Sequence, residues 1–448
     1  MALFADRTRM MGTENAFKMG HHINRAEASG QPVIRLNLGE PDFNAPEWVV
    51  EAVVAQFRAG NTRYCDPQGL LGLRQAIARQ TGERRGLEIL PEQVCVFPGG
   101  KPSIAFTQQL YCNPGDEIIY PSPGFPIYES MVTYVGAIPV PLHLEPSEGF
   151  TFNPEQLREL ITPRTKLIIL NFPSNPTGGV ADAGQLDAIA EVILSSCRPD
   201  VRVYSDEIYE NIIFGGRPHA SIASVPGMAE RTLIASGFSK SFAWTGGRVG
   251  YVVCPTVEEA LEFKRLNINY FSCIPPYNQE GARVALEHPG SVSWIAEMTA
   301  AFERRADAVI KDLNRIDGIC CDMPKGAFYA FPDIEGLCQR LGMTDAYAGL
   351  PKEIRHQTSV SGLFQMFALY RHGVAVLDRA SFGTVGADQK ESTQHFIRLS
   401  LASGRQDLAK GVARLAAAGD DVIGFQVFIE KDIELILSRD STPEVKPL

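Results

Sequence analysis

Short apolar runs and amphipathic helical patterns alternate through the middle of this 448-residue chain. Apolar runs typical of buried strands are Val94–Phe97, Glu117–Tyr120, Leu167–Leu170, Val201–Tyr204, Leu233–Ala235 and Val249–Val253. Helical spacing separates them, as at Leu186, Ile189 and Ile193, which follow the capping residue Asp182. This alternation predicts a mainly parallel sheet with helices on both faces.

The same pattern divides the chain into three segments. Residues 1–48 are predicted to form an N-terminal arm and part of a small domain. Residues 49–300 hold the alternating strands and helices and form the large domain. Residues 301–448 form the C-terminal small domain, with strand patterns at Gly373–Leu377 and Phe396–Ser400. We therefore expect a three-layer α/β/α large domain with a mainly parallel sheet, and a smaller α+β domain.

Composition is that of an ordinary globular protein, with 45% hydrophobic and 21% charged residues. The net charge of −10 argues against a nucleic-acid binder and against binding to an anionic membrane surface. We expect no signal peptide and no membrane span, because no apolar run approaches the roughly 20 residues that a span needs. The nine cysteines include no C-x-x-C pair, and His21–His22 has no further ligand nearby. These features predict no metal site and a reducing, cytoplasmic location.

The stretch Ser236–Gly250 places two charged side chains among small and aromatic residues. Lys240 follows an apolar strand, and burial there would disfavour the ammonium form and make the amine a nucleophile toward an aldehyde. Arg248 is flanked by glycines, which let a phosphate approach its guanidinium. A solvated surface lysine is the alternative for Lys240 taken alone. An aldehyde and a phosphate on one small molecule describe pyridoxal 5′-phosphate (PLP), which would make residues 49–300 the PLP-binding domain.

Candidate ligands also follow the other strands, where parallel sheets bind their ligands. Gly99 and Gly100 precede a helix whose free amides suit a phosphate, although two glycines alone are a weak signal. Phe125 is suited to stack on a planar ring or to pack in the core. Asn175 suits a phenolate-like oxygen or an ordinary proline-bounded turn. Asp206 suits a protonated pyridine nitrogen, with a helix cap as its alternative role.

Together these residues resemble the class I and II, fold type I, PLP-dependent aminotransferases, nearest the aspartate aminotransferase-like branch. The resemblance extends from about Ile34 to Ser400. Its motifs, in chain order, are Gly-Glu-Pro-Asp-Phe (39–43), Arg63-Tyr64 with Gly69, Gly99-Gly-Lys, Phe125, Asn-Pro-Thr-Gly (175–178), Asp-Glu-Ile-Tyr (206–209), Ser239-Lys240 with Gly-x-Arg-x-Gly (246–250), Gly-Ala-Phe-Tyr (326–329) and Arg398-Leu-Ser. Each motif is weak alone, and the ordered set is specific.

The resemblance implies a role for each of these residues. Lys240 would form a Schiff base with PLP and then move a proton between the substrate Cα and the cofactor C4′. Asp206 would pair with the pyridine nitrogen, Tyr209 and Asn175 would bind the ring oxygen, and Phe125 would stack on the ring. The implied phosphate ligands are Gly99, Gly100, the backbone of Lys101, Ser239 and Arg248.

The implied partners are a second copy of the chain and two small substrates. Tyr64 would reach the phosphate bound to the neighbouring subunit, which implies a homodimer with shared active sites. The implied substrate-binding residues are Gly39, Phe125, Asn175 and Arg398. Among them, Arg398 would bind the α-carboxylate of the L-amino acid whose amino group passes to a 2-oxo acid. Lys101 matches a position that pairs with the distal carboxylate of acidic substrates, so we expect aspartate or glutamate to be accepted.

Several positions depart from the family pattern. Phe125 stands where Trp or Tyr is common, and Trp244 and Gly247 stand where an aliphatic and a bulky residue are usual. Arg379 lies where relatives usually have Pro-Gly-Ser. It is a second candidate for binding an acidic side chain, although we favour a surface arginine. These differences bear on which substrate is bound and leave the expected cofactor unchanged.

Two other reaction classes remain open at this stage. A PLP-dependent lyase, decarboxylase or oxidase would use the same scaffold and the same lysine base. A nucleotide-binding oxidoreductase is disfavoured, because no G-x-G-x-x-G motif follows a strand with an acidic residue about 20 positions later.

Overall fold

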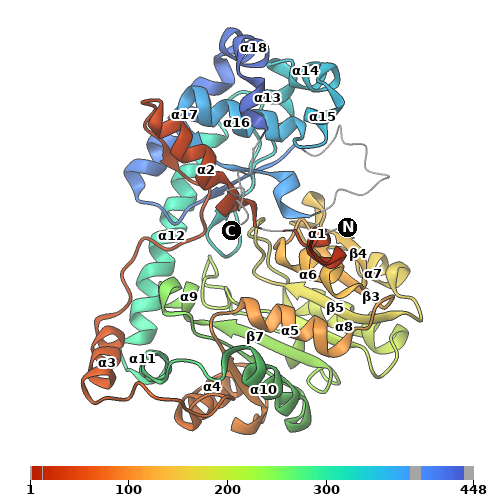
Figure 1. The fold of residues 1–448 in the computed structure, drawn as a ribbon, viewed down its shortest axis with the longest axis vertical. Coiled ribbons are helices and arrows are strands. Elements are labelled where there is room, and N and C mark those ends of the chain that lie inside the picture. Colours follow the sequence, from red (N-terminus) through yellow and green to blue (C-terminus); the bar gives the residue numbers. More distant parts are fainter. Residues whose placement is uncertain (1–2, 13, 384–394, 438–448) are drawn as a thin grey trace. The chain divides into compact units, whose positions relative to one another are not determined.

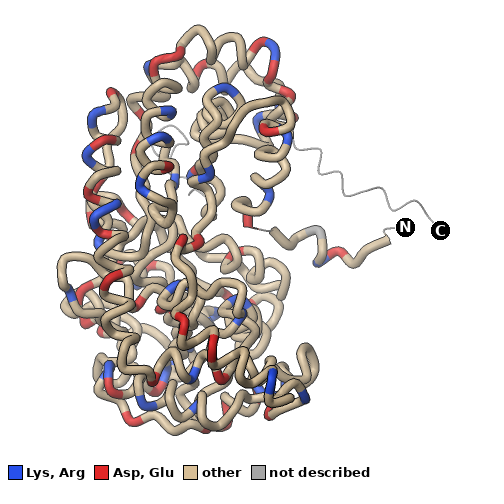
Figure 2. Tube along the Cα trace, turned by 90° about the vertical axis from the view of Figure 1, so that its left-hand side faces the viewer, with Lys and Arg blue, Asp and Glu red and all other residues tan. Residues whose placement is uncertain are grey.

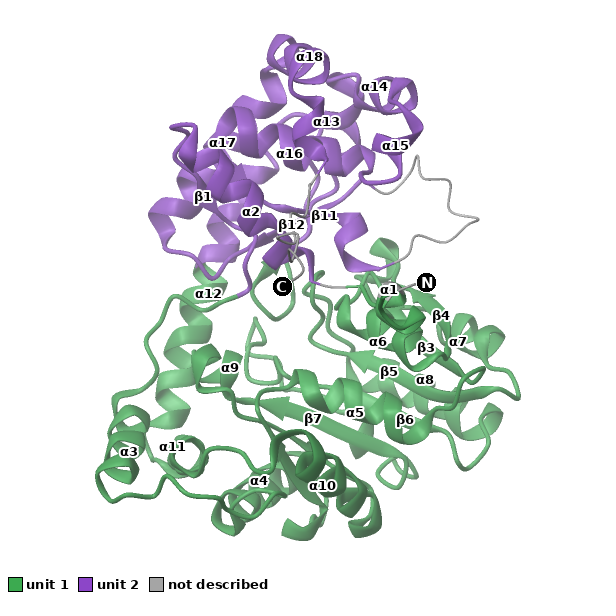
Figure 3. Cartoon of the chain, in the orientation of Figure 1, with its two compact units in different colours: residues 1–13, 40–304, 324–329 green, residues 14–39, 305–323, 330–448 purple. Residues whose placement is uncertain are grey.

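A computed structural model describes residues 3–12, 14–383 and 395–437 of the chain. The chain forms two compact units, coloured separately in Figure 3. The larger unit contains residues 1–13, 40–304 and 324–329, and the smaller unit contains residues 14–39, 305–323 and 330–448. The smaller unit therefore combines segments from both ends of the chain.

The larger unit is built on a seven-stranded sheet with the order β2-β8-β7-β6-β5-β3-β4. All neighbouring strands are parallel except β8, which runs antiparallel to β2 and β7. The strands are β2 (Val94–Phe97), β3 (Glu117–Ser122), β4 (Ile138–His143), β5 (Thr165–Asn171), β6 (Arg202–Asp206), β7 (Thr232–Gly237) and β8 (Gly250–Val253). The sequence pattern missed β4, an edge strand. It contains Pro139 and Pro141, which are tolerated at an edge because proline has no backbone N–H to donate to a neighbour.

Helices cover both faces of this sheet (Figure 1). Side chains alternate along β2, so Cys95 and Phe97 pack with α5, α6 and α10, whereas Val94 and Val96 pack with α4 and α11. The helices of this unit are α1 (Asp6–Met10), α3 (Glu47–Arg58), α4 (Leu71–Arg85), α5 (Lys101–Tyr111), α6 (Ile127–Val135), α7 (Pro154–Leu160), α8 (Ala183–Ser196), α9 (Phe238–Ser241), α10 (Val257–Phe271), α11 (Pro276–Glu287) and most of α12 (Ser291–Leu313). The predicted three-layer α/β/α architecture is confirmed.

The smaller unit is mainly helical with short strands. Its helices are α2 (Asn15–Ala28), α13 (Glu335–Arg340), α14 (Met343–Gly349), α15 (Lys352–Arg355), α16 (Val360–His372), α17 (Arg405–Asp420) and α18 (Val422–Lys431). Strand β1 (Ile34–Arg35) pairs in parallel with β10 (Val374–Ala375), and β11 (Leu377–Asp378) pairs antiparallel with β12 (Ile397–Ser400). The remaining strand, β9 (Tyr329–Ala330), lies where the chain passes from the larger to the smaller unit. Helix α16 is the core of the smaller unit, since its residues 360–369 are all buried.

Acidic and basic residues are interspersed along the described chain rather than segregated (Figure 2). Among the described helices, none has the length and apolar character needed to cross a membrane. All nine cysteines are free thiols.

Candidate active site

Residues that the sequence analysis selected converge on the carboxyl edge of the large sheet. Strands β3, β5, β6 and β7 run in parallel, so the segments that follow them lie at one edge. Phe125 follows β3, Asn175 follows β5, Asp206 ends β6, and Lys240 follows β7. The strand order places Asp206 between the segments that carry Asn175 and Lys240.

The antiparallel strand β8 begins at this same edge and brings Arg248 to it. Gly250, its first residue, lies opposite Phe97 of β2 and opposite Gly237 of β7. Gly99 and Arg248 meet closely, because a Cβ atom at Gly99 would lie 2.0 Å from Nη2 of Arg248. Gly99 also has a φ of +86°, which favours glycine. A side chain at position 99 would displace the guanidinium.

Gly100 is the N-cap of α5, and its surroundings are open. No heavy atom of the described chain lies within 4 Å of a Cβ built there. The first amides of this helix have no partner within the helix and carry a partial positive charge. Arg248 is exposed and donates from Nη1 to the carbonyl of Thr245 at 2.8 Å. Together with the hydroxyl of Ser239 in α9, these donors fit a phosphate monoester.

Asp206 is a buried carboxylate with a phenol as its partner. The hydroxyl of Tyr128 donates to it at 2.7 Å. Burial raises the pKa of Asp206 to about 6, although the hydrogen bond from Tyr128 opposes this rise. Tyr128 was not predicted as a site residue; it follows Phe125 by three residues and reaches Asp206 from α6. A protonated ring nitrogen fits this site, because a cation would offset the desolvation of the carboxylate.

Because the pKa of Asp206 is raised, we predict that the free energy of unfolding of the cofactor-free protein falls as the pH rises. Below about pH 3 the carboxyl is protonated in both the folded and unfolded states, and above about pH 7 it is ionised in both. The raised pKa of Asp206 therefore lowers the free energy of unfolding by about 3 kcal/mol at pH 8 and by only about 0.5 kcal/mol at pH 4. Asp206→Asn should remove this cost, raising the melting temperature of the cofactor-free protein at pH 8 and leaving it nearly unchanged at pH 4. A gain of equal size at both pH values would contradict the assignment.

Asn171 links the Asn175 segment to the end of β6. Its Nδ2 donates to the backbone oxygen of Asp206 at 3.0 Å, and its Oδ1 accepts the backbone N–H of Asn175 at 3.0 Å. Asn175 is itself buried. The two candidate ring ligands, Asn175 and Asp206, are thereby held in a fixed relation by one amide side chain.

Lys240 and Tyr209 have aromatic neighbours from residues 324–329 of the same unit. Lys240 is half-buried, and its Nζ lies 5.8 Å from the ring centroid of Phe328. Tyr209 is buried, and its hydroxyl lies 2.7 Å from that of Tyr329. Lys240 thus lacks the full exposure of a solvated surface lysine.

Lys101 and Phe125 lie together at the same edge. Nζ of Lys101 is 5.7 Å from the ring centroid of Phe125, within range of a cation–π contact. Phe125 also packs edge-on against Tyr128, with ring centroids 5.8 Å apart. Tyr64, in contrast, is 86% exposed and is directed to solvent in the single chain.

Three further candidates, Gly39, Arg379 and Arg398, belong to the smaller unit. Arg398 lies on β12, is buried, and donates from Nη2 to the backbone oxygen of Asn37, two residues before Gly39. Its guanidinium carbon is 4.9 Å from the ring centroid of Phe382. The surface position favoured for Arg379 is wrong, because that side chain is only 2% exposed. Its Nη1 donates to the carbonyl of Gly383 at 3.0 Å, one of the contacts that make its burial possible.

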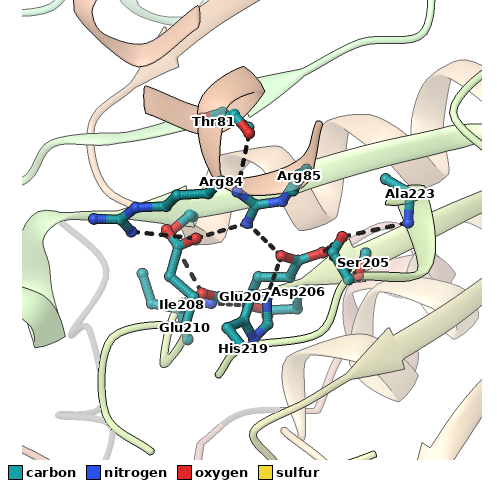
Figure 4. Close-up of polar contacts among 12 residues, drawn as sticks. Thr81, Arg84, Arg85, Ser205, Asp206, Glu207, Ile208, Glu210, His219 and Ala223 are labelled. Carbon is teal, nitrogen blue, oxygen red and sulfur yellow. Dashed lines mark hydrogen bonds and ion pairs between the residues drawn. The ribbon is translucent and has the colours of Figure 1, made fainter. Parts of the chain in front are cut away.

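An ion cluster that was not predicted is formed by buried Arg85, Glu207 and Glu210 with half-buried His219 (Figure 4), and its member Glu207 directly follows Asp206 in the chain. Arg85, at the end of α4, donates from Nη2 to Glu207 and, at 2.6 Å, to Glu210. Nε2 of His219 lies 2.6 Å from Glu207. Burial alone would raise the pKa of Glu207, but the charge of Arg85 holds that pKa well below its usual range.

Three members of this cluster, two glutamates and a histidine, also have the spacing of metal ligands. One ligand atom from each of Glu207, Glu210 and His219 lies within 4.8 Å of the others. Arg85 already pairs with both carboxylates and Arg84 lies 3.7 Å from Glu210, so the protein itself supplies the countercharges of the cluster. We therefore interpret it as a structural support beneath Asp206.

Comparisons with known proteins identify the family of this chain. Residues 31–415 match the family described as aminotransferase class I and II. The chain is 33% identical to the probable aspartate/prephenate aminotransferase of Aquifex aeolicus, over 88% of this chain and 93% of that protein. It is 34% identical to the aspartate aminotransferase of Musicola paradisiaca, over 93% of this chain and 97% of that protein.

A solved structure is similar over nearly the whole chain. The crystal structure of the aspartate aminotransferase from Rhizobium meliloti matches with a TM-score of 0.82 and 32% identity, covering 94% of this chain and 99% of that one. The chain belongs to the class I and II aminotransferases, PLP-dependent enzymes that move an amino group between an amino acid and a 2-oxo acid.

Proposed function

We propose that this chain binds PLP at the carboxyl edge of its large sheet and transfers the amino group of aspartate or glutamate to a 2-oxo acid. The observation that supports this most is that three groups lie at one edge of the sheet. They are the amine of Lys240, the buried carboxyl group of Asp206, and the phosphate-binding site formed by Gly99 and Arg248. When bound, PLP supplies an aldehyde that reacts with amines and a ring that accepts electrons.

Each residue proposed to lie around the cofactor ring has a separate role. The amine of Lys240 would hold PLP at its aldehyde carbon and would take up the proton of the substrate Cα. The carboxylate of Asp206 holds the ring nitrogen in its protonated form. Tyr209 and Asn175 donate to the ring oxygen, and Phe125 packs on the ring face.

Two further sets of residues are proposed to bind the phosphate of the cofactor and the carboxylate of the substrate. The α5 amides after Gly99 and Gly100, the backbone of Lys101, the hydroxyl of Ser239 and the guanidinium of Arg248 hold the phosphate. Arg398, with the backbone of Gly39, binds the substrate α-carboxylate through a bidentate contact. That contact fixes which bond to Cα is broken, which favours amino-group transfer over other reactions of the same lysine.

Lys101 is proposed to select acidic substrates. Its ammonium lies at the face of Phe125, and the Aquifex and Musicola relatives are named for activity on aspartate. A hydrogen bond to a charged group contributes about 1.5–3 kcal/mol, so Lys101→Ala should lower kcat/KM for aspartate and glutamate by roughly 10- to 100-fold. The value for alanine as donor should change much less.

The experiment measures kcat/KM for aspartate, glutamate, alanine and phenylalanine with 2-oxoglutarate as acceptor, in the original protein and in Lys101→Ala. Oxaloacetate is the acceptor when glutamate is the donor. Aspartate and glutamate turnover that is unchanged in the variant would remove Lys101 as the selector. A preference of the original protein for apolar donors would contradict the proposed substrate class.

We also propose that the active form is a homodimer in a reducing compartment such as the cytoplasm. Val50, Val54 and Phe57 form an exposed apolar stripe along α3, and Tyr64 follows this helix with its side chain in solvent. The nine free thiols fit a reducing location. Sedimentation equilibrium should give twice the chain mass, 2 × 49.1 kDa. A monomer that retains full activity would contradict the proposed sharing of active sites.

A further inference from the structure

We propose that Cys65 and Cys273 form a reversible disulfide, and that the pair is a thiol-modification site for small disulfides such as oxidised glutathione. Both thiols are half-buried, unlike the buried cysteines of the sheet core. Sγ of Cys65 lies 3.3 Å from the carbonyl oxygen of Ile274, the residue that follows Cys273. Two segments that are far apart in the sequence therefore place their cysteines side by side within the larger unit.

A buried amide side chain holds the two segments together. Nε2 of Gln279 donates to Sγ of Cys65 at 3.4 Å and to the carbonyl of Ile274 at 2.8 Å. Its Oε1 accepts the backbone N–H of Leu70 at 2.7 Å. Gln279 is completely buried, so it fixes the approach of the Cys65 segment to the Cys273 segment.

The backbone just before Cys273 is in an uncommon conformation. Ser272 has φ +63° and ψ −58°, and the N–H of Cys273 donates to the carbonyl of Phe271 at 2.7 Å. These values describe a γ-turn of the strained kind, which persists only where the surroundings hold it. The turn ends α10 abruptly and directs the chain toward Cys65.

The two side chains also interact directly. Burial and, after it, the adjacent side chain of Cys273 raise the pKa of the Cys65 thiol to about 11. A thiol that is deprotonated so rarely attacks slowly, so Cys273 is the expected site of first attack on an external disulfide.

The exchange balances in two steps. The Cys273 thiol loses a proton, and its sulfur attacks oxidised glutathione, breaking that S–S bond and releasing one glutathione thiolate. The Cys65 thiol then loses its proton, and its sulfur attacks the Cys273 sulfur, forming the intramolecular bond and releasing the second glutathione thiolate. Two electrons pass from the cysteines to the glutathione disulfide, and the two released protons convert its halves to thiols.

The disulfide would restrict the segment that carries Tyr64, because Cys65 directly follows it. This consequence rests on the proposed role of Tyr64 at the neighbouring phosphate. Disulfide formation itself does not depend on that role and is measured without any assay of activity.

The test equilibrates the PLP-loaded, full-length protein in buffers of increasing oxidised-to-reduced glutathione ratio. Free thiols are then alkylated in denaturant and mapped by mass spectrometry. Cys65 and Cys273 should lose alkylation together, with one midpoint, and a peptide pair joined through these residues should appear. Reduced dithiothreitol should restore both thiols.

Two variants and one matched control complete the design. In Cys65→Ser and in Cys65→Ala, the joined peptide should vanish and Cys273 should carry glutathione instead. Cys320→Ser removes the exposed cysteine and should leave the Cys65–Cys273 link intact. The proposal is overturned if both thiols stay alkylatable at the most oxidising ratio, if either pairs with another cysteine, or if isotope-labelled mixtures show that the link joins two chains.

Discussion

Replacing Lys240 with alanine is expected to lower kcat for amino-group transfer by at least about 10⁴-fold. The substitution removes the amine that binds the cofactor aldehyde, and it also removes the base that moves the Cα proton. Water does not replace a base held at the carboxyl end of β7, because the effective concentration of a positioned group far exceeds that of one in solution. The measurement is the rate of oxaloacetate formation from aspartate and 2-oxoglutarate.

An exposed lysine of the smaller unit gives the matched control. Lys410 is exposed on α17 and is not one of the proposed cofactor residues, so Lys410→Ala should keep kcat within about twofold. If Lys240→Ala kept more than a tenth of the original activity, Lys240 would not be the residue that performs the chemistry.

Replacing Arg85 with methionine is expected to lower the free energy of unfolding by about 3–5 kcal/mol. The guanidinium pairs with both Glu207 and Glu210, and all three side chains are at most 5% exposed. Without Arg85, two buried carboxylates would lie close together with much less compensation, because the nearest atom of Arg84 is 3.7 Å from Glu210 and that side chain is 41% exposed. Unfolding by urea, followed by fluorescence and circular dichroism, measures the loss.

Arg158→Met is the matched comparison, since it breaks an exposed ion pair with Glu155 on α7. Exposed pairs contribute about 0–1 kcal/mol, so this variant should remain close to the original protein in stability. Arg85→Lys retains the charge and should fall between the two. Equal losses for Arg85→Met and Arg158→Met would show that the buried cluster does not support the fold.

The sequence predicted the strands of the large sheet where apolar runs were continuous, as in β2 and β5. It also predicted which segments would meet, because parallel strands present their carboxyl ends at one edge. It missed β4, since Pro139 and Pro141 interrupt an otherwise typical strand pattern. It gave no helix assignment for residues 333–362, where the structure has α13, α14, α15 and the start of α16.

Contacts between distant polar residues were beyond the sequence pattern. Arg85 and Glu207 are 122 positions apart, and an arginine at the end of a helix, next to Arg84, is typical of a surface charge. Tyr128 was missed for a related reason, since its contact with Asp206 depends on where α6 begins. Arg379 was expected at the surface because charged residues usually lie there, yet backbone acceptors within its own unit permit its burial.

The central claim is that the edge carrying Lys240 and Asp206 binds PLP and performs amino-group transfer. The most direct measurement adds PLP to the cofactor-free protein, records the visible absorption spectrum, and then adds aspartate without an acceptor. We predict a visible band that Lys240→Ala lacks, that bleaches with aspartate, and that returns with 2-oxoglutarate without release of free ammonia. Absence of the band at saturating PLP, or bleaching accompanied by an equivalent of ammonia, would contradict the account.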